Sequence, residues 1–119
     1  MRPSHCLLLL AFVLCMPLAH AEQRVRVGAY HFPPYVVKPE STAPGGLLPE
    51  LLAALNQSQQ DYRFDLVPTS VTRRYRDLQQ ARYDMILFES PDWGWQNIPL
   101  QKLDLQITDA EVYVARAGE

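Results

Sequence analysis

Five short segments of the chain predict strands, four by alternation of hydrophobic and polar residues and one by an unbroken apolar run. Residues 25–29 and 62–66 alternate strictly, which is typical of strands with one apolar face. Residues 85–88 are an unbroken apolar run, which is typical of a parallel strand covered on both faces. Residues 103–107 and 112–114 alternate again and predict two more short strands.

Two further segments have helical spacing. Five leucines follow Gly46 on one side of a predicted helix over 47–55: Leu47, Leu48, Leu51, Leu52 and Leu55. A second helix is predicted to begin near Ser70 or Thr72, with Val71, Tyr75 and Leu78 facing inward. The order β-α-β-α-β-β-β predicts an α/β domain with a mainly parallel open sheet and flanking helices.

The loop between the first strand and the first helix, residues 30–46, is rich in aromatic residues and proline. Tyr30, Phe32 and Tyr35 surround Pro33-Pro34, which cannot continue either kind of element. In open α/β sheets, ligands bind outside the carboxyl ends of the strands. The loop is therefore the predicted start of a ligand site, although ordinary packing of the three rings is an equal alternative.

The first 21 residues are predicted to be a secretory signal peptide. Arg2 provides a basic start, residues 6–16 are apolar, and Ala19-His20-Ala21 is a cleavage motif. A membrane anchor would need about 20 apolar residues, and a lipoprotein would need small residues before Cys15. We therefore expect a signal peptide over 1–21, one domain over 22–119, and export through the signal peptide.

Cleavage would remove Arg2, both cysteines and two of the three histidines. The remaining chain has 10 basic and 13 acidic residues, which makes nucleic acid a poor partner. With no cysteine and only His31, disulfides, thiolate chemistry and a histidine metal site are not expected. No catalytic motif is present either, so the sequence favours a non-enzyme without a cofactor.

Three segments in this order resemble the extracellular solute-binding proteins of family 3. They are the helix start Gly46-Leu47 with Glu50-Leu51-Leu52, the turn 78–85 (LQQARYDM), and Val112-Tyr113-Val114-Ala115-Arg116. The resemblance implies a monomeric periplasmic receptor that passes amino acids or similar small polar or zwitterionic solutes to the membrane permease of an ABC importer. It also implies a type II periplasmic-binding-protein-like first lobe, with the second lobe absent. We expect either a truncated fragment, which is favoured because a single lobe buries little of a ligand, or a one-lobe protein.

The chain departs from the family pattern at two places. The family's glycine before the third strand is Ala81 here. The family's carboxylate-binding arginine after that strand is missing, because Lys102 is the only cation between Met85 and Ala115. Arg73 or Arg74 could replace it, and Arg73 is preferred as the nearer to a strand end, although both could simply form a solvated basic face.

The expected ligand-binding residues lie after the three main strands. They are Tyr30, Phe32, Tyr35, Arg73, Glu89 and Trp93. Glu89, Trp93 and Trp95 could form an aromatic wall beside a carboxylate, or could fill a hydrophobic corner. Two other functions stay open: a dehydratase of the same fold with Glu89 as general acid, and an extracytoplasmic sensor domain.

Overall fold

The computed structural model describes residues 21–110 and 114–118. The predicted signal peptide, except for Ala21, therefore lies outside the described residues. The chain divides into two units, Met1–Phe88 and Glu89–Glu119, and each is described by itself.

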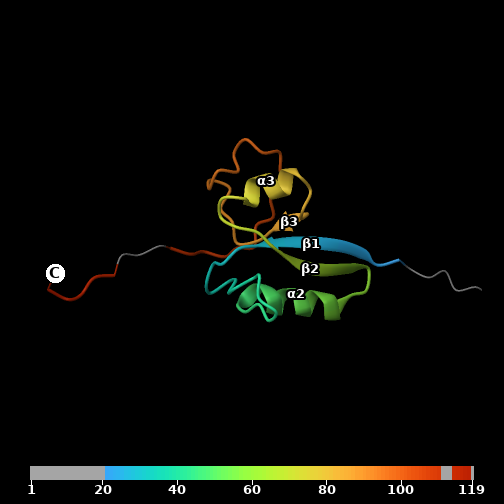
Figure 1. Cartoon of the computed structure of the whole chain (residues 1–119), viewed down its shortest axis with the longest axis horizontal. Helices are drawn as coiled ribbons and strands as arrows, with labels where there is room; N and C mark the ends of the chain where they lie inside the picture. Colours follow the sequence, from blue (N-terminus) through green and yellow to red (C-terminus); the bar gives the residue numbers. More distant parts are fainter. Residues whose placement is uncertain (1–20, 111–113, 119) are drawn as a thin grey trace, which may run out of the picture. The chain divides into compact units, whose positions relative to one another are not determined.

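The first unit contains an open, all-parallel sheet of three strands with two helices (Figure 1). The predicted α/β class and parallel sheet are confirmed. The elements in chain order are β1 (Gln23–Ala29), α2 (Leu47–Ser58), β2 (Tyr62–Pro68), α3 (Arg74–Gln79) and β3 (Met85–Ile86).

The strand order in the sheet is β2-β1-β3, so the chain reverses direction across the sheet beside β1. β1 pairs with β2 along its whole length, from Gln23 opposite Tyr62 to Ala29 opposite Pro68. β3 is short and pairs only with Val27 and Gly28 of β1. The two helices lie on opposite faces of the sheet (Figure 1), so the reversal point is between β1 and β3.

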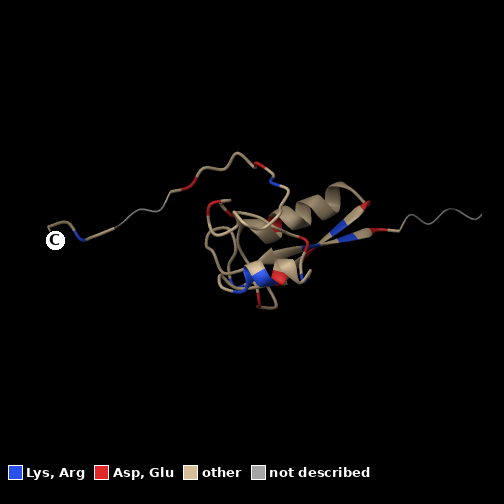
Figure 2. Cartoon of the chain, turned by 90° about the horizontal axis from the view of Figure 1, so that it is seen from above, with Lys and Arg blue, Asp and Glu red and all other residues tan. Residues whose placement is uncertain are grey.

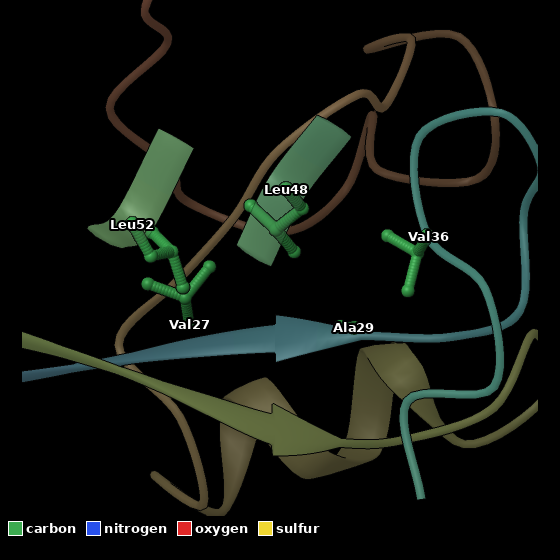
Figure 3. Packing of buried hydrophobic residues seen from close by; sticks show 5 residues of the cluster. All are labelled: Val27, Ala29, Val36, Leu48 and Leu52. Atoms are coloured by element: carbon green, nitrogen blue, oxygen red, sulfur yellow. The ribbon is translucent and has the colours of Figure 1, made fainter. Parts of the chain in front are cut away.

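The main hydrophobic core lies between the sheet and α2 (Figure 3). Residues on alternate positions of β1 point to this face because side chains alternate along a strand. Each fully buried valine or leucine contributes about 1.5–3 kcal/mol relative to exposure. The buried members are Val27, Ala29, Val36, Leu48 and Leu52.

The opposite face of the sheet packs against a polar part of α3. The ring of Tyr83 is fully buried against Gly28, where an added Cβ would lie 2.8 Å from ring carbons. The Tyr83 hydroxyl donates a hydrogen bond to the carbonyl oxygen of Arg74. Both Arg74 and Asp77 are buried on α3, and Thr69 Oγ1 donates to Asp77 Oδ2 at 2.8 Å.

The inward face predicted for the second helix is therefore wrong in part. Val71 is 54% exposed, because it lies in the turn before α3. Tyr75 and Leu78 are only half-buried. A hydrophobic pattern cannot predict this face, because charged side chains with hydrogen-bond partners occupy its most buried positions.

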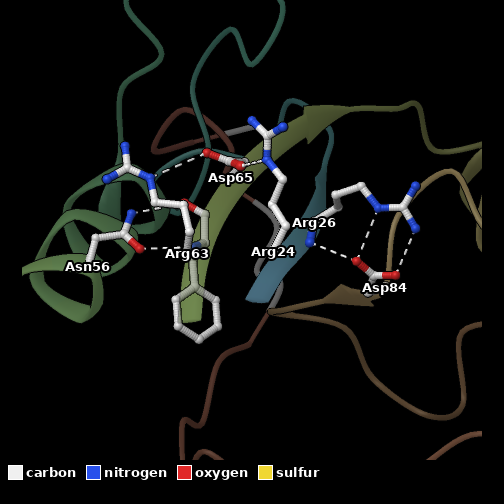
Figure 4. A network of polar contacts seen from close by, with 7 residues as sticks. Arg24, Arg26, Asn56, Arg63, Asp65 and Asp84 are labelled. Carbon is white, nitrogen blue, oxygen red and sulfur yellow. Dashed lines mark hydrogen bonds and ion pairs between the residues drawn. The ribbon is translucent and has the colours of Figure 1, made fainter. Parts of the chain in front are cut away.

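Ion pairs link the three strands near their amino ends (Figure 4; Figure 2 colours the charged residues of the described part of the chain). Arg26 binds Asp84 through two side-chain contacts, at 3.1 Å from Nε and 2.8 Å from a terminal nitrogen. The Arg26 backbone N–H also donates to Asp84 Oδ2 at 2.8 Å. Asp84, predicted to be a turn residue, thus fixes the start of β3 against β1. Arg24 Nε of β1 lies 2.5 Å from Asp65 Oδ2 of β2, and Arg63, on the same strand as Asp65, lies 3.7 Å from its other carboxylate oxygen.

Two amide side chains at the end of α2 bind the backbone of β2. Asn56 accepts a hydrogen bond from the Phe64 N–H at 2.7 Å and donates to the Phe64 carbonyl at 2.9 Å (Figure 4). Gln59 makes the same pair of bonds with Tyr62, both at 2.8 Å. β2 is an edge strand, so its outward backbone groups have no neighbouring strand to bind. The two amide side chains therefore take the place of a neighbouring strand at Phe64 and Tyr62.

Of the predicted strands, one does not form and one is shorter than predicted. Residues 103–107 form no strand, and Leu103 is 76% exposed, because alternation alone does not make a strand without a partner. The predicted strand 85–88 ends at Ile86, since Phe88 has a φ of 61°, which no β-strand residue adopts. Of the predicted strand 112–114, residues 112 and 113 lie outside the described residues.

Candidate functional site

The loop after β1 is folded back on itself and bound to the start of α2. Phe32 and Val36 exchange two backbone hydrogen bonds, and so do Val37 and Gly45. The carbonyl oxygens of Pro34 and Tyr35 accept hydrogen bonds from the first N–H groups of α2, at 3.2 and 2.8 Å. These bonds satisfy donors that a helix start otherwise leaves unpaired.

Gly46 makes this attachment possible. Its φ of 95° and ψ of −175° lie in a region that only glycine adopts readily. An added Cβ would lie 2.6 Å from the Tyr35 carbonyl oxygen and 2.8 Å from that of Pro34. The loop can therefore approach the helix only because residue 46 has no side chain.

Four aromatic rings from the loop and from the end of β3 form a continuous row, here called the aromatic row. The ring centroids of Tyr30 and Phe32 are 5.9 Å apart, and those of Phe32 and Tyr35 are 5.3 Å apart. Tyr35 stacks on Phe88 at 4.6 Å with an angle of 17° between the ring planes. Sequence analysis predicted that Tyr30, Phe32 and Tyr35 would lie together, and the structure brings them together.

A small hollow lies beside the aromatic row at the carboxyl ends of β1 and β3. Its volume is about 10 Å³, room for about one water molecule. The hollow is at the reversal point of the sheet, which is where open α/β sheets bind ligands. It is lined by Gly28, Ala29, Tyr30, Phe32, Val36, Ile86, Leu87 and Phe88.

Arg74, and not Arg73, lies against the aromatic row. The Arg74 guanidinium carbon is 5.3 Å from the Tyr30 ring centroid and 4.4 Å from that of Tyr75. Arg74 is only 5% exposed, so these cation–π contacts are shielded from water. Cation–π contacts are stronger when they are shielded in this way. Arg73 is exposed, and its side chain donates to Ser70 Oγ at 3.2 Å. The basic residue that reaches the predicted site is thus one position later than the preferred candidate.

Glu89 and Trp93 belong to the second unit. The Trp95 indole N–H donates to Glu89 Oε2 at 2.6 Å, and Trp95 is buried. Trp93 is 42% exposed, and its backbone N–H donates to the Ser90 carbonyl at 3.1 Å. Glu89 therefore binds an indole of its own unit.

Sequence reasoning missed Phe88 as a member of this site and ranked Arg74 below Arg73. The apolar run 85–88 predicts a strand that ends at Phe88, and the pattern does not indicate that the Phe88 ring meets the loop. The alternation along β1 puts Gly28 and Tyr30 on the side opposite to Val27. The connection from β2 to β3 through α3 passes over that side, so Arg74 can be assigned to it once the strand order is known.

Hydrogen bonds from the side chain and backbone of Arg26 hold the pKa of Asp84 below its ordinary value. This pair lies at the amino end of the sheet, away from the hollow, so it stabilises the fold and does not belong to the site.

Neither a metal site nor a membrane span is found in the described part of the chain. Within residues 21–110 and 114–118, no three His, Cys, Asp or Glu side chains are grouped closely enough to hold a metal ion. No helix there has the length and hydrophobicity that crossing a bilayer requires.

Comparison with known proteins gives no relative. No protein-family model matches the chain, and no curated protein or solved structure shows significant similarity to it.

Proposed function

We propose that the chain is the first lobe of a periplasmic solute-binding protein that captures a small polar or zwitterionic solute for an ABC importer. Binding is non-covalent, needs no cofactor, and begins at the aromatic row. Residues Tyr30, Phe32 and Tyr35 contact the solute, and Arg74 supplies positive charge behind Tyr30. The finer fold assignment, a type II periplasmic-binding-protein-like lobe, is part of this proposal.

The observation that carries the proposal is the position of the hollow. Strand order β2-β1-β3 places the reversal point of the sheet between β1 and β3. The residues that line the hollow come from the ends of those two strands. A concave site at this point is the usual ligand position of open α/β sheets, and in the proposed function a partner lobe would close over it.

The turn before β3 gives independent support. Ala81 stands where the family pattern has glycine, and its φ is 55°. Glycine is favoured in this left-handed region because it has no Cβ. The backbone at Ala81 therefore has the left-handed conformation in which the glycine of the family pattern would be favoured.

The chemistry of the site suits a solute that has both an apolar and an anionic part. Aromatic faces bind apolar or flat groups, and a buried guanidinium produces a positive potential that favours carboxylates over amines. A lone lobe covers only one side of a ligand, so we expect millimolar affinity or weaker from the chain by itself.

Nuclear magnetic resonance titration of the purified chain tests the proposal, because it detects binding in the millimolar range. The panel contains neutral, acidic and basic amino acids, together with a polyamine as a cationic control. We expect amide shifts confined to Tyr30–Tyr35 and Ile86–Phe88, larger for acidic and neutral solutes than for the polyamine. Shifts that are absent, or that are spread over the strand ion pairs instead, would contradict a solute site at this edge.

A further inference from the structure

The residue at the end of the aromatic row, Phe88, has a backbone conformation that phenylalanine seldom adopts. Its φ is 61°, in the left-handed region, where a bulky side chain is strained. The residue is only half-buried, so packing does not enclose its ring completely. Strain of this kind, next to a candidate site, indicates a residue whose position serves the site.

The ring of Phe88 covers a face of Tyr35. The two rings are 4.6 Å apart and nearly parallel, the geometry in which a flat ligand would stack on a tyrosine. The hollow next to them holds about one water molecule, so a solute can enter only if a lining side chain moves.

Phe88 is the lining residue best placed to move. Gly28 and Ala29 belong to β1, and Ile86 is paired in β3. Val36 is in the buried core and is bonded to Phe32 through the backbone. Phe88, in contrast, follows the last strand and is only half-buried.

We propose that the Phe88 ring occupies the place of the solute's own ring, and that the site binds a solute with a planar, benzene-sized ring. Such a solute replaces Phe88 on Tyr35 and leaves its polar groups outside the hollow. This inference rests on the proposed binding function and narrows it to ring-bearing solutes. A saturated ring of the same size is puckered and makes poorer contact with a flat face.

Removing the ring tests the proposal with benzoate and cyclohexanecarboxylate as probes. The two carry the same charge and differ in the flatness of the ring. Phe88→Gly removes the competing ring and suits the left-handed backbone. We expect this variant to bind benzoate at least about tenfold more tightly than the wild-type chain. In the wild-type chain the Phe88 ring occupies the face of Tyr35 in most molecules, whereas in the variant this face is open in all of them. Cyclohexanecarboxylate should gain much less.

Two further variants make the test specific. Leu87→Ala enlarges the same hollow without uncovering Tyr35, so it should not gain benzoate affinity. Adding Tyr35→Leu to Phe88→Gly should abolish the gain. Equal gains for Leu87→Ala, or for both probes, would show that only cavity volume matters and would overturn the proposal.

Folding of the variants is checked by circular dichroism. If Phe88→Gly does not fold, Phe88→Asn replaces it, because asparagine tolerates a positive φ. If neither variant folds, Phe88 is a structural residue and the proposal fails. If the folded variants bind no benzoate while the wild-type chain responds to the amino acid panel, the solute-binding function stands and the displacement of Phe88 is wrong. If the folded variants bind benzoate while the wild-type chain does not respond to the amino acid panel, the displacement of Phe88 stands and the proposed binding of amino-acid-like solutes is wrong.

Discussion

Replacing Ala81 with glycine is expected to stabilise the protein. Ala81 follows the end of α3, where the N–H of Arg82 donates to the Asp77 carbonyl and the N–H of Ala81 donates to the Leu78 carbonyl, at 2.8 and 2.9 Å. These two bonds are those of a Schellman motif, in which the residue at the position of Ala81 is left-handed and is usually glycine. The φ of 55° at Ala81 shows that alanine adopts this conformation here.

The size of the effect follows from two opposing terms. A left-handed backbone costs a residue with a Cβ about 1–2 kcal/mol. Glycine gains flexibility in the unfolded chain, which offsets about 0.4–1 kcal/mol of that benefit. Ala81 is exposed, so no packing is lost. The net stabilisation is about 0.5–1 kcal/mol, which corresponds to a rise in Tm of about 2–8 °C for a domain of this size.

Thermal unfolding followed by circular dichroism measures this shift, with Gln80→Gly as the matched control. Gln80 is the neighbouring exposed residue, and its φ of −87° suits any side chain. Glycine there only adds flexibility to the unfolded chain, so the Tm should fall. If Ala81→Gly lowers the Tm as much as Gln80→Gly does, the left-handed assignment of this turn is wrong.

Three further predictions concern the loop, the buried arginine and the ion pair of β3. Gly46→Ala should destabilise the fold by about 2–3 kcal/mol in urea unfolding, because of its backbone angles and its two carbonyl contacts. Gly45→Ala, whose added Cβ would meet only Val37 at 3.6 Å, should change little. Arg74→Met should lower the free energy of unfolding by about 1–3 kcal/mol in the same measurement, because Arg74 is buried against two rings. Arg73 is exposed, so Arg73→Met should stay within about 0.5 kcal/mol of wild type. Equal effects of the two substitutions would refute the role of burial. Hydrogen bonds from Arg26 lower the pKa of Asp84 in the folded protein. The Arg26–Asp84 pair therefore stabilises the fold fully above about pH 4, the ordinary pKa of an aspartate, and this stabilisation is lost as the pH falls through the lower folded-state pKa. The difference in urea midpoint between wild type and Asp84→Asn should therefore shrink below that pH, and a difference that stays constant down to pH ~2 would contradict the linkage.

The parts of the fold that could be predicted from sequence are those that depend on regular spacing. Alternation located β1 and β2, and leucines at helical spacing located α2 to within three residues of its observed end at Ser58. Parallel pairing followed from the alternation of strands and helices along the chain. The meeting of Tyr30, Phe32 and Tyr35 followed from their common position after β1.

The remaining features depend on contacts between distant residues. Nothing in the pattern around Arg74 indicates burial, because a guanidinium is buried only where partners such as the Tyr30 and Tyr75 rings are present. The early end of β3 depends on the backbone angle of Phe88, which alternation does not reveal. Residues 103–107 have a strand pattern, but in the second unit they have no strand partner.

The amide pairs of Asn56 and Gln59 have a consequence for how this sheet can associate with other chains. An open edge strand is a template on which another polypeptide can add a strand, and this is a common route to aggregation. At Tyr62 and Phe64 that template is already occupied by side chains of the same protein. Any strand-by-strand growth of the sheet is therefore directed to the side of β3, next to the candidate site.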